Sequence, residues 1–278
     1  MESDITTVLA HSRPTLFIFC LTLALAFSFE FVNGLHDTVN AVATAIYTKT
    51  LKPTVAVLLS ALMNFLGVFF AGTAVAYGIL KLLPTRVLEE APIEAPLSIV
   101  IAALLSSISW NLLTWYRGIP SSSSYTLIGS ILGVGLVMLI LLAFIPSHTA
   151  AVPSWMVVFV ALALGIGTTI GWKRIVVTVG EKIGKTHLAP IQGAAAELTA
   201  ALTISLSSLF GLPVSTTHVL SSGVTGTMVA KGGGVQNATI RKILLAWVLT
   251  LSVSMAVSFL LFFLLRWLFG LSDLSPLK

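Results

Sequence analysis

The residues best suited to chemistry form a polar segment, EFVNGLHDTVNAVATAIY, at positions 30–47. Oxygen-bearing side chains recur along it at intervals of three or four residues: Glu30, Asn33, Asp37, Asn40 and Thr44. On a helix this spacing places them on one face. Carboxylate and amide oxygens are the ligands that hard cations prefer, and a carboxylate in apolar surroundings readily takes up a proton. The segment therefore predicts a site for a cation or a proton, unless Asp37 lies at a membrane interface and only caps the following helix.

A second feature is a repeat of hydroxyl-bearing residues. GIPSSSSYTLIGSILG at 118–133 and GLPVSTTHVLSSGVTG at 211–226 align with a constant offset of 93 residues. In each copy Gly-Pro ends one helix and a Ser/Thr run lies where the next begins, because proline lacks an N–H and disfavours helix in the residue before it. Hydroxyls cap helix N-termini, which bind oxyanions through free N–H groups and partial positive charge. Two such ends facing each other would cradle a small anion, whereas either copy alone could be a plain surface turn.

The elements that position these segments are membrane helices. Of the 278 residues 56% are hydrophobic and 9% are charged, whereas a soluble domain carries about a quarter charged residues. Several apolar runs approach the roughly 20 residues that a helix needs to cross the hydrocarbon core. They lie at 16–29, 54–80, 97–113, 128–145, 155–170, 198–210 and 243–265. The sequence predicts an all-α polytopic membrane protein of about eight helical segments, with two related halves (an inverted repeat) and broken or half-helices.

The polar segment also predicts a break in its helix. A continuous helix over 16–47 would be about 48 Å long, which exceeds a hydrocarbon core of about 30 Å. Glycine tolerates non-helical backbone, so Asn33-Gly34 is the natural place for the break. We therefore expect the first helix to end near Gly34 and to resume after it.

The net charge of +5 does not indicate a nucleic-acid partner. The basic residues lie between apolar runs, where they report orientation, and their cluster at 173–187 predicts a cytoplasmic loop. The N-terminal segment carries Glu2 and Asp4 and lacks the pattern of a cleavable signal. We expect a multi-pass protein of the cell (inner or plasma) membrane, embedded in the lipid bilayer as one domain over 1–278.

Together the two features carry a resemblance to a known family. NGLHDTVNAVATAI resembles the Gly-Ala-Asn-Asp-x-x-Asn-Ala signature of the inorganic phosphate transporter (PiT) family, and GIPSSSSYT and GLPVSTTHVLSSGVTGTMVAKG resemble its paired Ser/Thr motifs. Within that family the sequence looks most like the bacterial low-affinity members. The resemblance covers nearly the whole chain. It implies a secondary transporter rather than an enzyme, with no catalytic residues, no metal centre and no cofactor beyond Na⁺ or H⁺ as coupling ion.

The resemblance, carried over by position, implies roles for nine residues. Phosphate would be held by the hydroxyl motifs, with Ser122, Ser123 and Ser124 in the first copy and Ser215, Thr216 and Thr217 in the second. The coupling ion would bind at Asn33, Asp37 and Asn40. The first half would cover 15–133 and the second, incomplete half 134–270. Two copies could form a homodimer.

One departure from the family pattern matters. The family carries a second Asn-Asp motif in its other half, whereas the only aspartates here are Asp4, Asp37 and Asp273. The chain is short for the family, as though an internal stretch with that motif were missing. Three functions stay open: phosphate transport coupled to H⁺ or Na⁺, sulfate transport by the same machinery, and a non-transporting form. A hydrolase built on Ser215 and His218 is disfavoured because the sequence has no Gly-x-Ser-x-Gly elbow.

Overall fold

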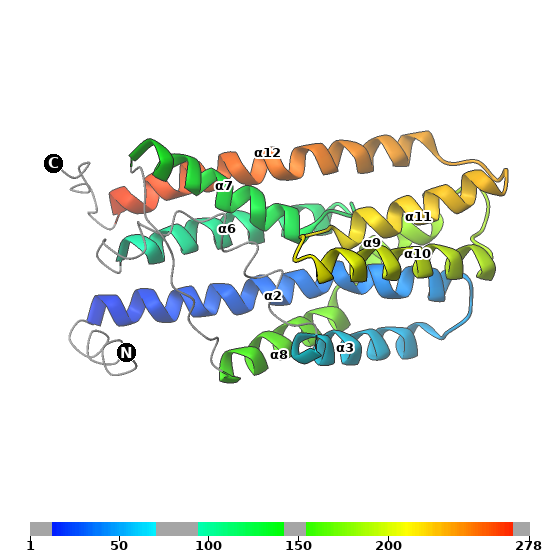
Figure 1. Cartoon of the computed structure of the whole chain (residues 1–278), viewed down its shortest axis with the longest axis horizontal. Helices are drawn as coiled ribbons and strands as arrows, with labels where there is room; N and C mark the ends of the chain where they lie inside the picture. Colours follow the sequence, from blue (N-terminus) through cyan, green and yellow to red (C-terminus); the bar gives the residue numbers. More distant parts are fainter. Residues whose placement is uncertain (1–12, 71–93, 142–153, 269–278) are drawn as a thin grey trace.

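The computed structural model describes residues 13–70, 94–141 and 154–268, and these residues form nine α-helices and no β-strand. Figure 1 shows the helices as an elongated bundle with most axes along its length. In chain order they are α2 (Arg13–Tyr47), α3 (Pro53–Phe70), α6 (Glu94–Tyr116), α7 (Ser123–Leu141), α8 (Ser154–Ile170), α9 (Lys173–Glu181), α10 (Pro190–Leu209), α11 (Thr216–Ala230) and α12 (Asn237–Leu268). The prediction of an all-α protein with about eight helical segments is confirmed.

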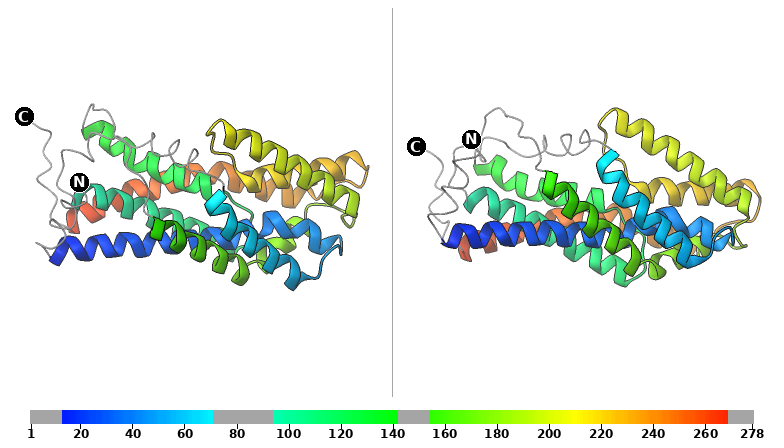
Figure 2. Two further views of the ribbon diagram at one scale, coloured as in Figure 1. Left: turned by 60° about the horizontal axis from the view of Figure 1, so that its bottom comes forward. Right: turned by 90° about the horizontal axis from the view of Figure 1, so that it is seen from below.

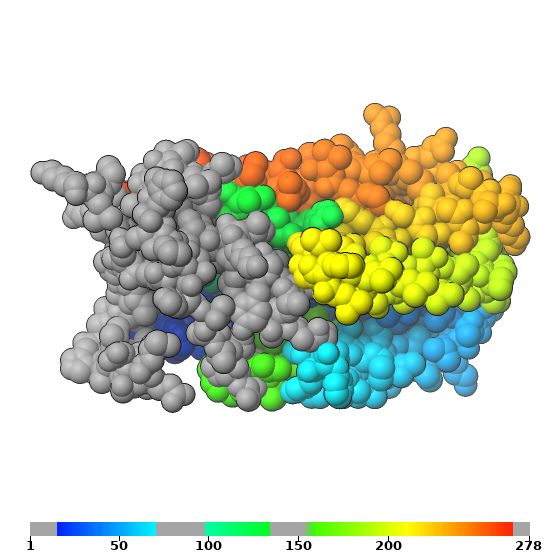
Figure 3. All heavy atoms as spheres, viewed as in Figure 1, coloured from blue at the N-terminus to red at the C-terminus, as the bar shows by residue number. Residues whose placement is uncertain are grey.

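Four of the described helices, α2, α3, α6 and α12, are long and apolar enough to cross a membrane. The pair α8 and α9, bent by 64°, would make a fifth crossing. Apolar side chains point outward from the bundle, as Leu198, Leu202 and Leu206 do on α10. Figure 3 shows α3, α10, α11 and α12 together on one such face. Exposing so much apolar area to water would be unfavourable, so a surface of this kind contacts lipid.

Helix α2 is continuous, so the predicted break at Asn33-Gly34 is wrong. The helix holds 35 residues and is about 52 Å long, so it must tilt or extend beyond a core of about 30 Å. Figure 2 shows α2 running along nearly the whole described bundle in both views. The polar stripe therefore lies on one unbroken helix.

The glycine at the predicted break allows two helices to pack closely. A Cβ on Gly34 would collide with the backbone of α8 near Thr168, and a Cβ on Gly167 of α8 would collide with the Phe31 carbonyl. The backbones of α2 and α8 are therefore in contact, as small residues permit in membrane bundles. Thr38 Oγ1 adds a hydrogen bond to the Thr168 carbonyl at 2.8 Å. Gly34 thus provides space for a neighbouring helix and does not interrupt its own.

Two helical hairpins, α6–α7 and α10–α11, carry the repeated motifs. Gly118 and Gly211 end the first helix of each hairpin with φ of +64° and +66°, a left-handed conformation that glycine adopts without strain. In both, the glycine N–H donates to the carbonyl three residues earlier, and the next N–H donates to the carbonyl five residues earlier. This is the Schellman pattern of helix termination. The 93-residue repeat is therefore also a repeat of backbone structure.

Helix α9 holds the turn of the first hairpin in place. Thr178 Oγ1 donates to the Gly118 carbonyl at 2.6 Å. Arg174 Nη1 donates to the Tyr116 carbonyl at 3.0 Å, and its guanidinium lies 5.1 Å from the centroid of the Trp115 ring. A cation at the last carbonyls of a helix offsets the negative end of the helix dipole. The bend between α8 and α9 thus brings a polar helix over the C-terminal end of α6.

The main buried core joins α2 to α9, α10 and α11. Its members include Val39 on α2, Val176 on α9, Ala196 on α10 and Leu220 on α11. The predicted boundary between the halves, at 133/134, falls inside α7. The bounds 15–133 and 134–270 stay a prediction.

Candidate functional site

The two Ser/Thr motifs lie at hairpin tips that point at each other. In Figure 1 the α6–α7 hairpin and the α10–α11 hairpin come from opposite ends of the bundle, and their turns meet near its middle. Tyr125 on α7 contacts His218 on α11, its counterpart in the repeat, with ring centroids 5.0 Å apart and ring planes at 88°. This is the edge-to-face geometry that aromatic rings prefer. The helix N-termini of the two copies are therefore neighbours.

Both tips are capped in the same way. Ser122 Oγ accepts a hydrogen bond from the Tyr125 N–H, and Ser215 Oγ accepts one from the His218 N–H, each at 3.1 Å. Both serines are buried. A serine that caps through its oxygen keeps its hydroxyl hydrogen as a donor. Each tip can therefore offer an O–H group as well as the partial positive charge of a helix N-terminus.

The second tip is bound to the polar stripe of α2. Asn40 Nδ2 donates to Thr216 Oγ1 at 2.8 Å and to Thr217 Oγ1 at 3.1 Å. Thr216 Oγ1 donates in turn to Asp37 Oδ1 in a longer contact of 3.4 Å. Two of the predicted coupling-ion residues are thus brought against two of the predicted phosphate-binding residues. A charge held at Asp37 would act directly on the second tip.

A second carboxylate joins the stripe from α10. Thr44 Oγ1 donates to Glu197 Oε1 at 2.6 Å. Glu197 was not among the predicted site residues, because an acid in an apolar run does not reveal its partner. Its isolation in AAAELTAALT was the signal that could have placed it at the site.

Among the residues that the structure describes, none gives the first tip a matching acidic partner. Ser123 is the counterpart of Thr216, and it is buried with 7% of its surface exposed. Its Oγ forms no hydrogen bond within the described part of the chain, whereas Thr216 is held by α2. Neither Ser122 nor Ser124 is bonded to a carboxylate of a described residue. This asymmetry corresponds to the absence of a second Asn-Asp motif from the sequence.

Asn33, the third predicted coupling-ion residue, does not contact either tip. Its Nδ2 donates to Glu30 Oε2 on the same helix at 3.3 Å. His36 is buried, and its Nε2 forms a hydrogen bond of 2.8 Å with the Asn111 carbonyl of α6. Helix α2 therefore contacts both hairpins, the first through His36 and the second through Asn40.

Polar atoms without hydrogen-bond partners gather around the tips. His218 stacks against Trp247 of α12, with centroids 4.1 Å apart and planes at 32°. The buried polar atoms that lack a partner within the described residues include Ser123 Oγ, Asn111 Nδ2, Asn40 Oδ1, His218 Nε2 and Trp247 Nε1. Buried polar atoms are normally hydrogen-bonded, so this concentration indicates a polar binding site. Asn111 and Trp247 were not predicted as site residues because only the fold brings them there. Tyr125 follows Ser124 directly in the first motif, so its place at the tip was visible in the sequence although no role was predicted for it.

No metal centre is evident among the residues that the structure describes. Across 13–70, 94–141 and 154–268, no three His, Cys, Asp or Glu side chains gather as a ligand group. A cation at the stripe would instead have carboxylate, amide and hydroxyl oxygens from Asp37, Asn40 and Thr216 nearby. That set suits a hard, singly charged ion or a proton.

Comparison with known proteins also indicates a transporter of phosphate. The model of the family described as "Phosphate transporter family" matches residues 33–141 and 134–258. A "Probable low-affinity inorganic phosphate transporter" of Bacillus subtilis (strain 168) is 31% identical over 90% of this chain and 97% of its own length. The "Low-affinity inorganic phosphate transporter PitA" of Escherichia coli (strain K12) is 27% identical over 86% of this chain and 95% of its own length.

A solved structure titled "The sodium-dependent phosphate transporter" shares the fold, with a TM-score of 0.78 and 18% identity. The match covers 90% of this chain and 99% of that chain. The alignment with the B. subtilis relative spans 332 residues, more than the 278 of this chain, so that relative contains internal residues that have no counterpart here. The shortened interior expected from the sequence is therefore real. A family model that covers most of the chain, together with a 31% identical relative matched over nearly its full length, shows that this chain belongs to the phosphate transporter family and is a multi-pass membrane protein.

Proposed function

We propose that this protein carries inorganic phosphate across the cell membrane, with Na⁺ or H⁺ as the coupling ion. The observation that supports it most is the pairing of two identically capped Ser/Thr helix N-termini through Tyr125 and His218. Membership of the phosphate transporter family supports the choice of phosphate as substrate. Phosphate would lie between the tips, where water is replaced by hydroxyl and N–H donors.

The anion would be recognised by donors that carry no full positive charge. The hydroxyl hydrogens of Ser122 and Ser215 are free because both serines cap through oxygen, and Ser123 Oγ has no described partner. Thr217 accepts from Asn40 and so can donate elsewhere. Uncharged donors bind an anion less tightly than arginine or lysine would, which suits a carrier that must release its substrate.

The coupling ion would act beside the anion at Asp37. An ionised carboxylate within a membrane costs at least about 2.5 kcal/mol, so a bound cation or proton would favour the loaded state. Thr216 links Asp37 to the second tip through a contact of 3.4 Å. Neutralising Asp37 would also lower repulsion between its carboxylate and the anion. Na⁺ is supported by the solved structure that shares this fold, which is of a sodium-dependent phosphate transporter, and H⁺ by the carboxylate itself.

Uptake of radiolabelled phosphate into proteoliposomes tests the proposal. We expect uptake above that of empty vesicles under a Na⁺ gradient or a proton gradient, and each gradient is applied alone. Ser215→Ala and Asp37→Asn should abolish uptake as well as the thermal stabilisation that phosphate gives the purified protein. Ser207→Ala is the matched control, because Ser207 is half-buried on α10 and its hydroxyl bonds only to the Thr203 carbonyl of the same helix. Uptake no higher than in empty vesicles under both gradients would reject the proposal.

A non-transporting form is the second candidate, and the unpartnered Ser123 at the first tip favours it. The chain would then bind phosphate without moving it, or would need a complete relative to supply the missing acidic motif. Phosphate-dependent stabilisation without uptake by the purified chain would support this candidate. Uptake by the purified chain alone would exclude it. Competition with sulfate in the same assay separates phosphate transport from sulfate transport.

A further inference from the structure

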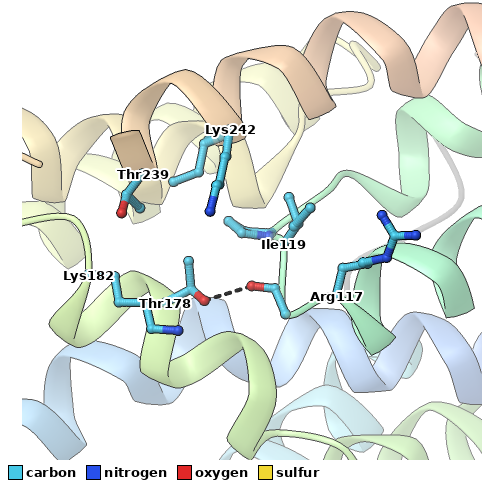
Figure 4. A pocket seen from close by; sticks show the side chains of 9 residues that line it. Arg117, Ile119, Thr178, Lys182, Thr239 and Lys242 are labelled. Atoms are coloured by element: carbon cyan, nitrogen blue, oxygen red, sulfur yellow. Dashed lines mark hydrogen bonds between the residues drawn. The ribbon is translucent and has the colours of Figure 1, made fainter. Parts of the chain in front are cut away.

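A small pocket lies against the turn of the first hairpin, and none of the motif serines and threonines at the facing tips lines it. Its volume is about 90 Å³, and Gly118, Ile119 and Pro120 form one wall. The remaining lining residues come from the ends of α6, α9 and α12: Arg117, Thr178, Lys182, Thr239, Lys242 and Ile243. Figure 4 shows these side chains around the turn.

The pocket is lined by three cations and by no acid. Arg117 follows the last residue of α6, Lys182 follows the last residue of α9, and Lys242 lies in the second turn of α12. Like charges in one small pocket repel each other unless an anion lies between them. The pocket therefore has the charge pattern of an anion site.

The polar groups converge on one side of the turn. In Figure 4, Lys182 and Lys242 lie near Thr178 and Thr239, while Arg117 lies on the other side of Ile119. Thr239 is in the first turn of α12, where the helix dipole adds partial positive charge, and its own N–H donates to the Gln236 carbonyl at 2.9 Å. Two ammonium groups, a hydroxyl and a helix N-terminus then face one small volume.

A structural role accounts for only part of this set. Cations near the C-terminal end of a helix offset its negative end, which explains Arg117 after α6 and Lys182 after α9. Lys242 has no such explanation, because it lies near the positive N-terminal end of α12. Helix capping therefore leaves its position beside Lys182 on the wall of this pocket without an explanation.

We propose that this pocket binds one phosphate group, held mainly by Lys182, Lys242 and Thr239, with Arg117 at its rim. A pocket of about 90 Å³ leaves room for a single tetrahedral oxyanion. The group is either free inorganic phosphate or the headgroup phosphate of an anionic lipid, because both present the same oxygens. This site is separate from the facing tips, and its occupancy does not depend on transport.

The wall of the pocket suggests what occupancy does. Pro120 is two residues before Ser122, the cap of the first tip, and Thr178 bonds the Gly118 carbonyl within the same turn. A phosphate group in the pocket would tie α9 and α12 to this turn. Bound free phosphate would also raise the local anion concentration beside the first tip.

Protection of lysines from acetylation tests the proposal directly. The purified full chain is treated with a limiting amount of an acetylating reagent, and the modification of each lysine is measured by mass spectrometry. Increasing inorganic phosphate should protect Lys182 and Lys242, while Lys185 and Lys231, which are also exposed but do not line the pocket, serve as internal controls. A ligand at ten times its dissociation constant leaves about a tenth of the sites free, so the protected lysines should react about tenfold more slowly. Chloride at equal ionic strength controls for screening.

Lipid is the second source to distinguish. In nanodiscs without added phosphate, phosphatidylglycerol should protect the same lysines if a headgroup fills the pocket, and phosphatidylcholine alone gives the baseline. Protection by phosphate assigns the site to the free anion, and protection by phosphatidylglycerol alone assigns it to lipid; both support a site for a phosphate group. If neither phosphate nor phosphatidylglycerol slows the acetylation of Lys182 and Lys242 more than that of Lys185 and Lys231, the proposal is overturned.

Variants check that the lysines form one site. Lys242→Gln should raise the phosphate concentration that half-protects Lys182 by about fivefold, as for a lost interaction of about 1 kcal/mol. Lys231→Gln should leave that concentration unchanged. Unchanged protection of Lys182 in folded Lys242→Gln protein would show that the two lysines do not share a ligand. Because the readout is local, failed phosphate uptake would not affect this result.

Discussion

The hydrogen bonds between α2 and the second tip lead to the sharpest prediction. Asn40→Ala removes two of them, from Nδ2 to Thr216 Oγ1 at 2.8 Å and to Thr217 Oγ1 at 3.1 Å. A side-chain hydrogen bond contributes about 1 kcal/mol in soluble proteins and averages about 0.6 kcal/mol between membrane helices. We therefore expect Asn40→Ala to lower the free energy of unfolding by about 1–2 kcal/mol.

The same change should weaken phosphate binding. With Asn40 in place, both threonine oxygens accept from its amide, so their hydroxyl hydrogens point elsewhere. Without it the Thr217 hydroxyl rotates freely and Thr216 keeps only its longer contact with Asp37. Ordering the tip again on binding then costs about 1 kcal/mol, or about fivefold in Kd. Thermal unfolding in detergent, with and without phosphate, measures both effects.

Asn64→Ala provides the matched control. Asn64 Nδ2 donates to Thr168 Oγ1 at 2.9 Å, which joins α3 to α8 away from the tips. This variant loses one hydrogen bond instead of two, so its stability should fall by about 0.5–1 kcal/mol, and it should keep the full stabilisation by phosphate. In a double-mutant cycle, Asn40→Ala and Thr216→Ala should deviate from additivity by more than about 0.5 kcal/mol. Additive effects, or equal loss of phosphate stabilisation in Asn64→Ala, would refute the reasoning.

Three further predictions concern stability, and thermal unfolding measures each. Gly167→Ala should destabilise strongly because its Cβ would meet a backbone carbonyl of α2, whereas Gly226→Ala, with open space around it, should gain about 0.5–1 kcal/mol. Gly118→Ala and Gly211→Ala should each cost about 1–2 kcal/mol, because both have left-handed backbone; a loss in only one copy would contradict their structural equivalence. Glu197→Gln keeps an oxygen acceptor for its threonine partner on α2 and should change stability little, whereas Glu197→Leu should cost about 1–3 kcal/mol; equal effects would contradict the hydrogen bond.

Local chemistry made the hairpin tips predictable. A positive-φ glycine, a following proline and a Ser cap are properties of a few adjacent residues, and both copies adopt the expected turn. The spacing of the polar stripe likewise predicted that Asp37 and Asn40 share a face. These features depend on backbone preferences that neighbouring helices do not override.

Features that depend on distant residues were not predictable. Gly34 suggested a break because the sequence does not show that Gly167 packs against it, about 130 positions later. The contacts of Tyr125 with His218 and of Thr44 with Glu197 also join residues far apart in the chain. Single residues in apolar runs, such as Asn111, do not reveal their neighbours.

The two tips differ in whether a carboxylate is bonded to them, and this affects how an anion between them would be repelled. Their caps and turns are equivalent, so the helix N-termini attract an anion to a similar extent. Only the second tip is bonded to Asp37 and Asn40, while Ser123 at the first tip has no described partner. An anion between the tips would therefore be repelled by a carboxylate from one side only. Under the proposed function, one cation or proton at Asp37 would remove that repulsion, and among the described residues the first tip has no bonded carboxylate that would need a second one.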